Sequence, residues 1–270
     1  MNTGQSFGDV RAQVGADGVA VITLCRAERL NAVTPRNFAE IEQAVRWVGS
    51  APGCRAVVLT GEGRSFCAGM DLNGSDPSYT EGGNDGLGRI ERGVAMLRAG
   101  VDVILALREI RQPVVGAIRG HAVGAGFALS AACDLRVCSP DARFNAALVK
   151  LGVSGGDLGL SWFLPRLVGR ALAAEVLYTG GVLDAEQART SGLVSRVVDD
   201  PLLTACDLAA QIAAQPAFGV SSTKELLNAS LDTGLRAHLD SEMRAQVLGL
   251  NTETFVRAVE SFRARNNGAH

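Results

Sequence analysis

Two loops rich in small residues could act through their backbone. Residues 60–72 (TGEGRSFCAGMDL, the first loop) follow an apolar run at 56–60, and residues 120–126 (GHAVGAG, the second loop) follow one at 114–118. The second loop leads into a predicted helix, and the first amides of a helix have no internal acceptors and carry the positive end of its dipole. Two such donors aimed at one point would stabilise a developing oxyanion. Alternatively, the glycines serve only close packing of helix on strand.

Other catalytic devices are not supported by the residue pattern. Residues 124–126 lack the third glycine of a dinucleotide-binding loop, which would stand at Leu129, and no GxxxxGK[ST] phosphate loop occurs. Ser65 and Cys67 have no partner base within their motif, so we do not expect a nucleophile there. The three histidines stand far apart, at His121, His238 and His270. Neither a metal site nor a Ser/His/Asp triad is therefore predicted.

The composition indicates a globular chain in which neither sign of charge dominates. The 270 residues are 47% hydrophobic, and 26 basic against 28 acidic residues give a net charge of −2. This balance does not favour binding to nucleic acid or to an anionic membrane. The six cysteines form no CxxC pair and are interpreted as reduced thiols. Without a signal-peptide pattern or a stretch long enough to span a bilayer, the protein is expected to be cytoplasmic.

Hydrophobic periodicity predicts alternating strands and helices over the first 200 residues. A hairpin is expected at 10–14 and 19–24, and a helix then begins with Thr34 as N-cap and Pro35 at its first position. The other predicted strands cover 56–60, 114–118, 135–137 and 193–198. The other predicted helices cover a long segment from Ile90 that ends before Pro113, and residues 124–133, 158–168, 171–178 and 185–190.

The chain is predicted to have three regions. Residues 1–9 are polar and are expected to be a disordered tail, whereas residues 10–200 mix strands and helices in one core. Residues 201–270 contain only amphipathic helical segments, which cannot bury their apolar faces alone, so we expect an oligomerisation region there. Within the core, residues 62–86 show no period and are either functional or mobile.

Several segments, in register along the chain, resemble the crotonase (enoyl-CoA hydratase/isomerase) family. The resemblance runs from about residue 10 to residue 200. The segments that carry it are 26–32 (RAERLNA), 65–72 (SFCAGMDL), 112–126 (QPVVGAIRGHAVGAG), 133–135 (CDL), 164–170 (LPRLVGR), 177–180 (LYTG) and 185–197. Several motifs in order are far more specific than any one of them.

The resemblance implies an α/β fold, a spiral of ββα turns with a C-terminal helical trimerisation region, and a homo-trimer or a dimer of trimers. It implies an acyl-CoA thioester as substrate and no cofactor besides the coenzyme A that the substrate carries. The implied oxyanion hole consists of the Met70 and Ala125 amides, with Gly124 adjacent. The residues implied to line the CoA channel are Glu28, Arg29, Leu30, Ala68, Asp71 and Leu72.

The resemblance breaks at the residues that define a hydratase. Enoyl-CoA hydratases of the family use two glutamates to position and activate water. Matched residue by residue, these positions hold Ala128 and Leu148 here. Because neither side chain can transfer a proton, the standard hydratase mechanism is not predicted.

One acid remains near the implied site. Counted back from Leu164-Pro165-Arg166, Asp157 matches the position at which dienoyl-CoA isomerases and aromatic acyl-CoA dehalogenases of the family place a catalytic aspartate. Against an apolar wall its pKa would rise toward that of a general base. The alternative is that Asp157 caps a helix starting near Leu158, which would lower its pKa and make it a poor base.

Three functional hypotheses follow. The first is an acyl-CoA isomerase or hydratase-like enzyme of fatty-acid or related acyl-CoA metabolism, in which Asp157 moves a proton. The second is a protein that binds acyl-CoA without catalysis. The third is a hydratase or other crotonase-type reaction, such as hydrolysis or decarboxylation, with a non-standard site. The fold alone cannot choose among them, because function resides in the site.

Overall fold

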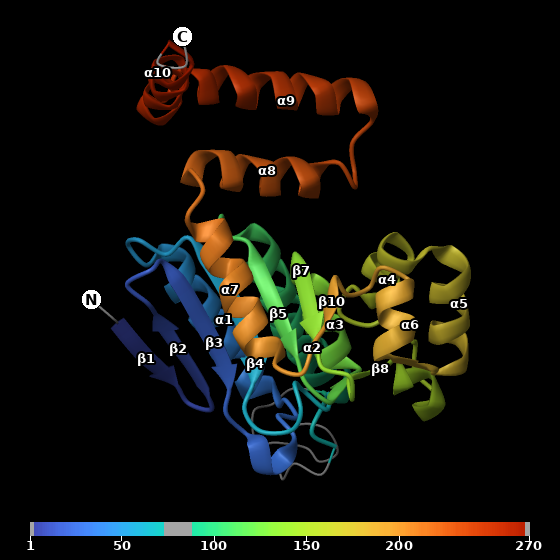
Figure 1. The fold of residues 1–270 in the computed structure, drawn as a ribbon. Coiled ribbons are helices and arrows are strands. Elements are labelled where there is room, and N and C mark those ends of the chain that lie inside the picture. The colour runs from blue at the N-terminus through green and yellow to red at the C-terminus, as the bar shows by residue number, and fades with distance from the viewer. Residues whose placement is uncertain (1–2, 73–87, 268–270) are drawn as a thin grey trace.

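The computed structural model of the chain describes residues 3–72 and 88–267. A seven-stranded sheet forms its centre (Figure 1). The strands, in spatial order, are β1 (Thr3–Phe7), β2 (Val10–Val14), β3 (Val19–Leu24), β4 (Ala56–Gly61), β5 (Val114–Ile118), β7 (Leu135–Cys138) and β10 (Arg196–Val197). Strands β1 to β3 pair antiparallel, and β3, β4, β5, β7 and β10 pair parallel.

Helices cover both faces of this sheet, which explains why β4 and β5 are continuous apolar runs. On one face lie α1 (Pro35–Ser50), α2 (Arg89–Glu109) and α3 (Ala125–Ala132), over a core that includes Phe38 and Phe127. On the other face lies α7 (Pro201–Ala213), whose alanines pack against Val58 and Val115.

A smaller sheet extends the core beside α3. It consists of β6 (His121–Val123), β8 (Arg143–Asn145) and β9 (Val182–Asp184), and β8 pairs parallel with β6 and antiparallel with β9. The helices that follow β8 are η2 (Ala147–Leu151), α4 (Leu160–Val168), α5 (Arg170–Thr179) and α6 (Ala185–Thr190), and a short helix, η1 (Ala27–Arg29), follows β3 of the large sheet. Successive strand–strand–helix units of this kind confirm the expected α/β spiral.

The last three helices stand apart from the sheet, with α9 and α10 farthest from it (Figure 1). They are α8 (Ala217–Ala229), α9 (Leu235–Leu250) and α10 (Glu253–Asn267). Large apolar side chains are exposed on all three, including Leu227, Leu239, Met243, Val247 and Phe262. The expectation of an oligomerisation region remains a prediction.

A buried lysine fastens α8 to the core. Lys224 is 5% exposed, and its ammonium donates to Asp134 Oδ2 at 2.9 Å and to the carbonyls of Leu107 and Gln112 at 3.1 and 2.9 Å. Burial lowers the pKa of Lys224, and the Asp134 carboxylate opposes that shift. Asp134 also accepts the Val114 amide at 2.8 Å, so one carboxylate links β5 to α8.

Most predicted elements occur close to their predicted bounds. The hairpin occupies the predicted residues, and Thr34 caps α1 in a capping box with Asn37. Three expectations differ from the structure. Residues 3–7 form β1, not a disordered tail, because they pair along the open edge of β2. Helix α7 packs on the sheet although it follows the predicted boundary at 200, and β10 is limited to two residues. The expectation for 62–86 falls partly on residues 73–87, outside the described residues.

Two further observations concern the predicted environment of the chain. All six cysteines are free thiols, as expected for reduced residues. Among the helices of residues 3–72 and 88–267, none is long and apolar enough to cross a membrane.

Candidate active site

The first loop lies along the second loop through backbone hydrogen bonds. The Phe66 amide donates to the Arg119 carbonyl at 2.7 Å, and the Cys67 amide donates to the His121 carbonyl at 2.9 Å. In return the Val123 amide donates to the Cys67 carbonyl at 3.0 Å. The two loops therefore continue from the ends of β4 and β5 as a parallel pair, as a sheet edge requires.

Two glycines allow the loops to approach this closely. A Cβ on Gly126 would lie 2.2 Å from the Cys67 carbonyl oxygen, and one on Gly69 would lie 2.7 Å from the Val123 carbonyl oxygen. Gly69 also has a φ of 92°, a conformation that side chains disfavour. The same Cβ position at Gly69 is only 3.9 Å from the Ala125 nitrogen, which places that amide against the residue before Met70.

The Ala125 amide opens α3 and points out of the helix. Gly124 is the N-cap, with φ 51° and ψ −111°, and the first bond of the helix runs from the Ala128 amide to the Gly124 carbonyl at 2.9 Å. Within the described part of the chain the Ala125 N–H donates to no acceptor, as expected for a first helical residue. The Gly124 amide, in contrast, donates to the Asn145 carbonyl at 2.9 Å.

Met70 is oriented by pairing with Val33. The Val33 amide donates to the Gly69 carbonyl at 2.8 Å, and the Asp71 amide donates to the Val33 carbonyl at 2.9 Å. In a parallel pair, the residue bracketed by two such bonds turns its own N–H and C=O to the opposite side. For Met70 that side is the one on which the second loop lies, because Cys67 pairs there with Ala122.

A third segment, residues 26–33, flanks the first loop on its other side. Asn31 is 1% exposed; its amide nitrogen donates to the Glu62 and Ser65 carbonyls at 2.9 and 2.8 Å, and its oxygen accepts the Arg26 amide at 2.9 Å. The Ala68 amide donates to the Leu30 carbonyl at 3.0 Å. The sequence pattern predicts no role for Asn31, although a side-chain amide within an otherwise apolar motif (LNA) is a signal for such a bridge.

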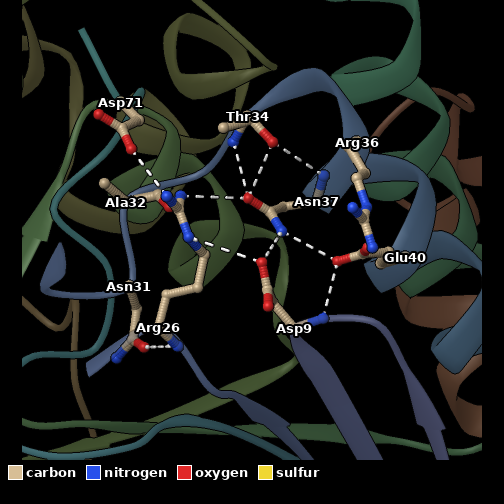
Figure 2. Close-up of polar contacts among 9 residues, drawn as sticks. All are labelled: Asp9, Arg26, Asn31, Ala32, Thr34, Arg36, Asn37, Glu40 and Asp71. Carbon is tan, nitrogen blue, oxygen red and sulfur yellow. Dashed lines mark hydrogen bonds and ion pairs between the residues drawn. The ribbon is translucent and has the colours of Figure 1, made fainter. Parts of the chain in front are cut away.

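The residues predicted to line a CoA channel divide into exposed and buried ones. Glu28 and Arg29 are exposed on η1, and Leu72 is 70% exposed. Leu30 and Ala68 are half-buried and joined through their backbones. Asp71 is 7% exposed, and its carboxylate accepts a bond from the Arg26 guanidinium at 2.9 Å (Figure 2). The Asp71 side chain thus points into the protein, toward Arg26.

The two positions that would hold hydratase glutamates are both apolar and close to the second loop. Ala128 is buried in the first turn of α3. Leu148 lies on η2, and its Cγ is 3.9 Å from where a Cβ on Gly124 would be. Leu148 therefore packs beside the turn that presents the Ala125 amide.

Asp157 does not cap a helix. Helix α4 begins at Leu160 with Gly159 as its N-cap and has no side-chain cap, and the Leu160 amide donates to the backbone carbonyl of Asp157 at 2.8 Å. The capping alternative is therefore wrong. Burial raises the pKa of Asp157, while a hydrogen bond from the Leu158 amide lowers it by less. Among the described residues, no hydrogen bond or ion pair joins Asp157 to either loop.

An apolar cavity of about 550 Å³ opens next to Asp157, at Leu158. Its walls come from α2, α4 and α8, and the apolar lining residues include Val101, Ile104, Leu105, Trp162 and Phe163. Polar and charged residues also line it, namely Arg108, Glu109, Glu225, Asn228 and Asp232, and the Arg108 guanidinium carbon lies over the Phe163 ring, 5.7 Å from its centroid.

The other polar side chains of the loops differ in exposure, and those of Ser65 and Cys67 are buried. Ser65 is fully buried and its hydroxyl accepts the His121 amide at 3.2 Å. Burial raises the pKa of Cys67 to about 12, so this thiol stays protonated at neutral pH and is not a nucleophile. The His121 side chain is exposed. Over residues 3–72 and 88–267, no cluster of three or more histidine, cysteine, aspartate or glutamate residues could hold a metal ion.

Comparison with known proteins identifies similar chains along nearly the whole length. Residues 15–267 match the family model described as enoyl-CoA hydratase/isomerase. A protein of Mycobacterium leprae named probable enoyl-CoA hydratase echA12 is 40% identical over 244 residues, which cover 89% of this chain and 82% of that protein. The 1,2-epoxyphenylacetyl-CoA isomerase of Escherichia coli is 34% identical over 252 residues, covering 93% and 94%.

Solved structures show the same fold. The crystal structure of an enoyl-CoA hydratase from Polaromonas sp. JS666 superposes with a TM-score of 0.86 at 30% identity, covering 96% of this chain and 98% of that one. That of an enoyl-CoA hydratase from Mycobacterium smegmatis superposes with a TM-score of 0.85 at 28% identity, covering 96% and 97%.

Proposed function

Because this chain belongs to the enoyl-CoA hydratase/isomerase family, we propose that it binds an acyl-CoA thioester with its carbonyl oxygen between the amides of Met70 and Ala125. It is an enzyme of the crotonase superfamily, and its place in acyl-CoA metabolism follows from the family. The supporting observation is the pairing of the two loops, which sets Ala125 beside the residue before Met70. The N–H of Ala125 has no acceptor within the described part of the chain. Gly124 shapes the turn, but its own amide is already bonded to Asn145.

The proposed reaction is an isomerisation with Asp157 as the proton carrier. The carboxylate would take a proton from a carbon near the thioester carbonyl, and the electron pair would move onto the carbonyl oxygen to give an enolate. The Met70 and Ala125 amides would stabilise that negative charge. Asp157 would then return the proton to another carbon, so the mass of the substrate would not change. No cofactor beyond the CoA of the substrate enters this sequence.

Three observations favour isomerisation over hydration. Ala128 and Leu148 provide no carboxylate to activate water at the positions that the family resemblance assigns to glutamates. Burial raises the pKa of Asp157, which makes its carboxylate a stronger base than an ordinary aspartate. One relative, the Escherichia coli protein, is named an isomerase.

We also propose places for the two ends of the substrate. Glu28, Arg29, Leu30, Ala68 and Leu72 would line the path of the CoA, and Asp71 would shape that path through its backbone, since its carboxylate is paired. The apolar cavity beside Leu158 is a candidate for the acyl chain. Assembly as a trimer or a dimer of trimers would cover the exposed apolar residues of α8 to α10. The free cysteines suit the reducing cytoplasm.

A second candidate is a protein that captures acyl-CoA without catalysis. It is favoured by the absence, among the described residues, of any hydrogen bond or ion pair between Asp157 and the two loops. In that case the same amides would hold the thioester, but no group would move a proton.

Incubation with a panel of enoyl-CoA and dienoyl-CoA thioesters, followed by mass spectrometry and absorbance, separates these functions. An unchanged mass with a shifted absorbance supports the isomerase, whereas a mass gain of one water indicates a hydratase. Binding without product over long incubation supports the non-catalytic candidate. Failure of every CoA thioester to bind would overturn the proposal.

A further inference from the structure

Arg26 connects three segments of the chain (Figure 2), one of which carries Asp71, the residue after Met70. One guanidinium nitrogen, Nη1, donates to the Ala32 carbonyl, and the other, Nη2, donates to Asp71 Oδ2 at 2.9 Å. The ion pair is largely enclosed, since the side chains of Arg26 and Asp71 are 18% and 6% exposed. A charge-assisted bond of this kind is strong, and burial strengthens it further.

These two contacts bracket the backbone that presents Met70. Ala32 directly precedes Val33, and Asp71 directly follows Met70, so the guanidinium links the two strands at their bridge. The two backbone hydrogen bonds of Val33, to residues 69 and 71, join the same two strands that the Arg26 guanidinium links. A shift of either strand would therefore have to stretch the Arg26 contacts as well.

The guanidinium also contacts residues outside the two strands, on the side of α1. Its Nε lies 3.6 Å from Asp9 Oδ2, and Nη1 lies 3.3 Å from Asn37 Oδ1. Asn37 in turn donates to Asp9 and Glu40 at 3.2 and 2.9 Å (Figure 2). Because Asn37 and Glu40 lie in α1, these contacts hold the Arg26 side chain in a fixed position relative to a helix of the core.

We propose that Arg26 is a positioning residue that holds the Met70 amide in line with the thioester carbonyl. This inference rests on the function proposed above. Among the described residues, every partner of the guanidinium is a protein oxygen, so Arg26 acts through the backbone and not by touching the ligand. Oxyanion donors act only when their geometry is fixed, and misplacement by about 1 Å can cost about 10²-fold in rate.

Four variants test this role. Arg26→Gln removes both the positive charge and the planar guanidinium that donates to two acceptors. Arg26→Lys keeps the charge, but a single ammonium cannot reach both the Ala32 carbonyl and the Asp71 carboxylate. Asp71→Asn breaks only the ion pair. Arg36→Gln is the matched control, because Arg36 pairs with Glu40 at 2.7 Å in the same network but has no contact with residues 32 or 71. For each variant, kcat and KM would be measured together with the infrared carbonyl frequency of a bound, unreactive acyl-CoA labelled with ¹³C at the thioester carbon.

The expected result is that Arg26→Gln and Asp71→Asn lower kcat by about 10- to 100-fold while KM changes by less than about threefold. Both variants would also reduce the downward carbonyl shift that the wild type gives on binding, and Arg26→Lys would restore it only in part. Arg36→Gln would match the wild type in both measurements. Asp71→Asn keeps the shape of the side chain, so it remains informative if Arg26→Gln fails to fold.

Two outcomes would overturn the inference in different ways. If the wild type shifts the carbonyl band and folded Asp71→Asn and Arg26→Lys shift it equally with unchanged kcat, Arg26 has no positioning role, while the proposed function stands. If the wild type itself binds acyl-CoA without a carbonyl shift, the oxyanion hole is absent and the proposed function fails together with the inference.

Discussion

Replacing Ala125 with proline should remove one oxyanion donor and leave the fold intact. Ala125 is the first residue of α3, a position at which proline is well tolerated because its N–H makes no helical bond. The preceding Gly124, at φ 51° and ψ −111°, has the mirror image of the extended conformation that the residue before a proline requires, and glycine, which has no Cβ, can precede proline in either form. Since the Ala125 N–H has no acceptor within the described residues, no internal hydrogen bond is lost.

The structure sets the expected magnitudes. The free energy of unfolding should change by no more than about 1 kcal/mol, as for a proline in a compatible backbone position. The transition state should lose about 2.7–4 kcal/mol, which lowers kcat by about 10²- to 10³-fold. The two quantities should thus separate, with a large effect on rate and a small one on stability.

Turnover of a responsive thioester, thermal unfolding and binding of free CoA would be measured in parallel. Ala185→Pro is the matched control, because Ala185 is the first residue of α6 and follows Asp184 in an extended conformation, φ −78° and ψ 177°. This control should retain full activity. If folded Ala125→Pro keeps kcat within about threefold of the wild type, a difference of less than about 1 kcal/mol in the barrier, the amide does not stabilise the reaction and the assignment is refuted.

Three further predictions follow from other contacts. Asp157→Asn should lower kcat by about 10²-fold or more in steady-state assays. Because burial raises the pKa of Asp157, its ionisation opposes folding, so Asp157→Asn should melt at a higher temperature than the wild type at neutral pH. This difference in melting temperature should vanish when the pH falls below 3.8, the ordinary pKa of an aspartate. Gly126→Ala should lower kcat and should lower the free energy of unfolding, measured in urea, by about 1–3 kcal/mol, because its methyl would meet a first-loop carbonyl oxygen 2.2 Å away. The control Gly219→Ala in α8, whose methyl would meet no described atom within 4 Å, should raise the free energy of unfolding by about 1 kcal/mol. Lys224→Met should cost about 1–3 kcal/mol in urea unfolding because it removes the buried ammonium and leaves the partly buried Asp134 carboxylate without its closest cation.

Each of these predictions has a result that contradicts it. Equal melting temperatures of wild type and Asp157→Asn across the whole pH range would mean that Asp157 is not desolvated. A Gly126→Ala variant as stable and active as the wild type would show that the loops can separate without loss. A Lys224→Met variant that unfolds at the same urea concentration as the wild type would show that α8 is held by other contacts.

The sequence alone determined the local elements and the identity of the loops. Alternation of apolar and polar residues fixed the hairpin of β2 and β3, and Thr34 with Pro35 fixed the start of α1, because these signals act between residues one to four positions apart. The family motifs located the two loops and Asp157, although they gave no role to Asn31 or Arg26.

Only the tertiary structure decided which of these residues meet. Arg26 and Asp71 are 45 positions apart in sequence, and nothing in either motif shows that they pair. The backbone path before α4 excluded the capping role of Asp157, because the chain makes one more turn and leaves Gly159 as the cap. The sequence of α7 is amphipathic like that of the C-terminal helices that follow it, but its alanines pack on the sheet. Local spacing carries the period of an element, whereas the partner of a buried charge or an apolar face depends on how distant segments are brought together.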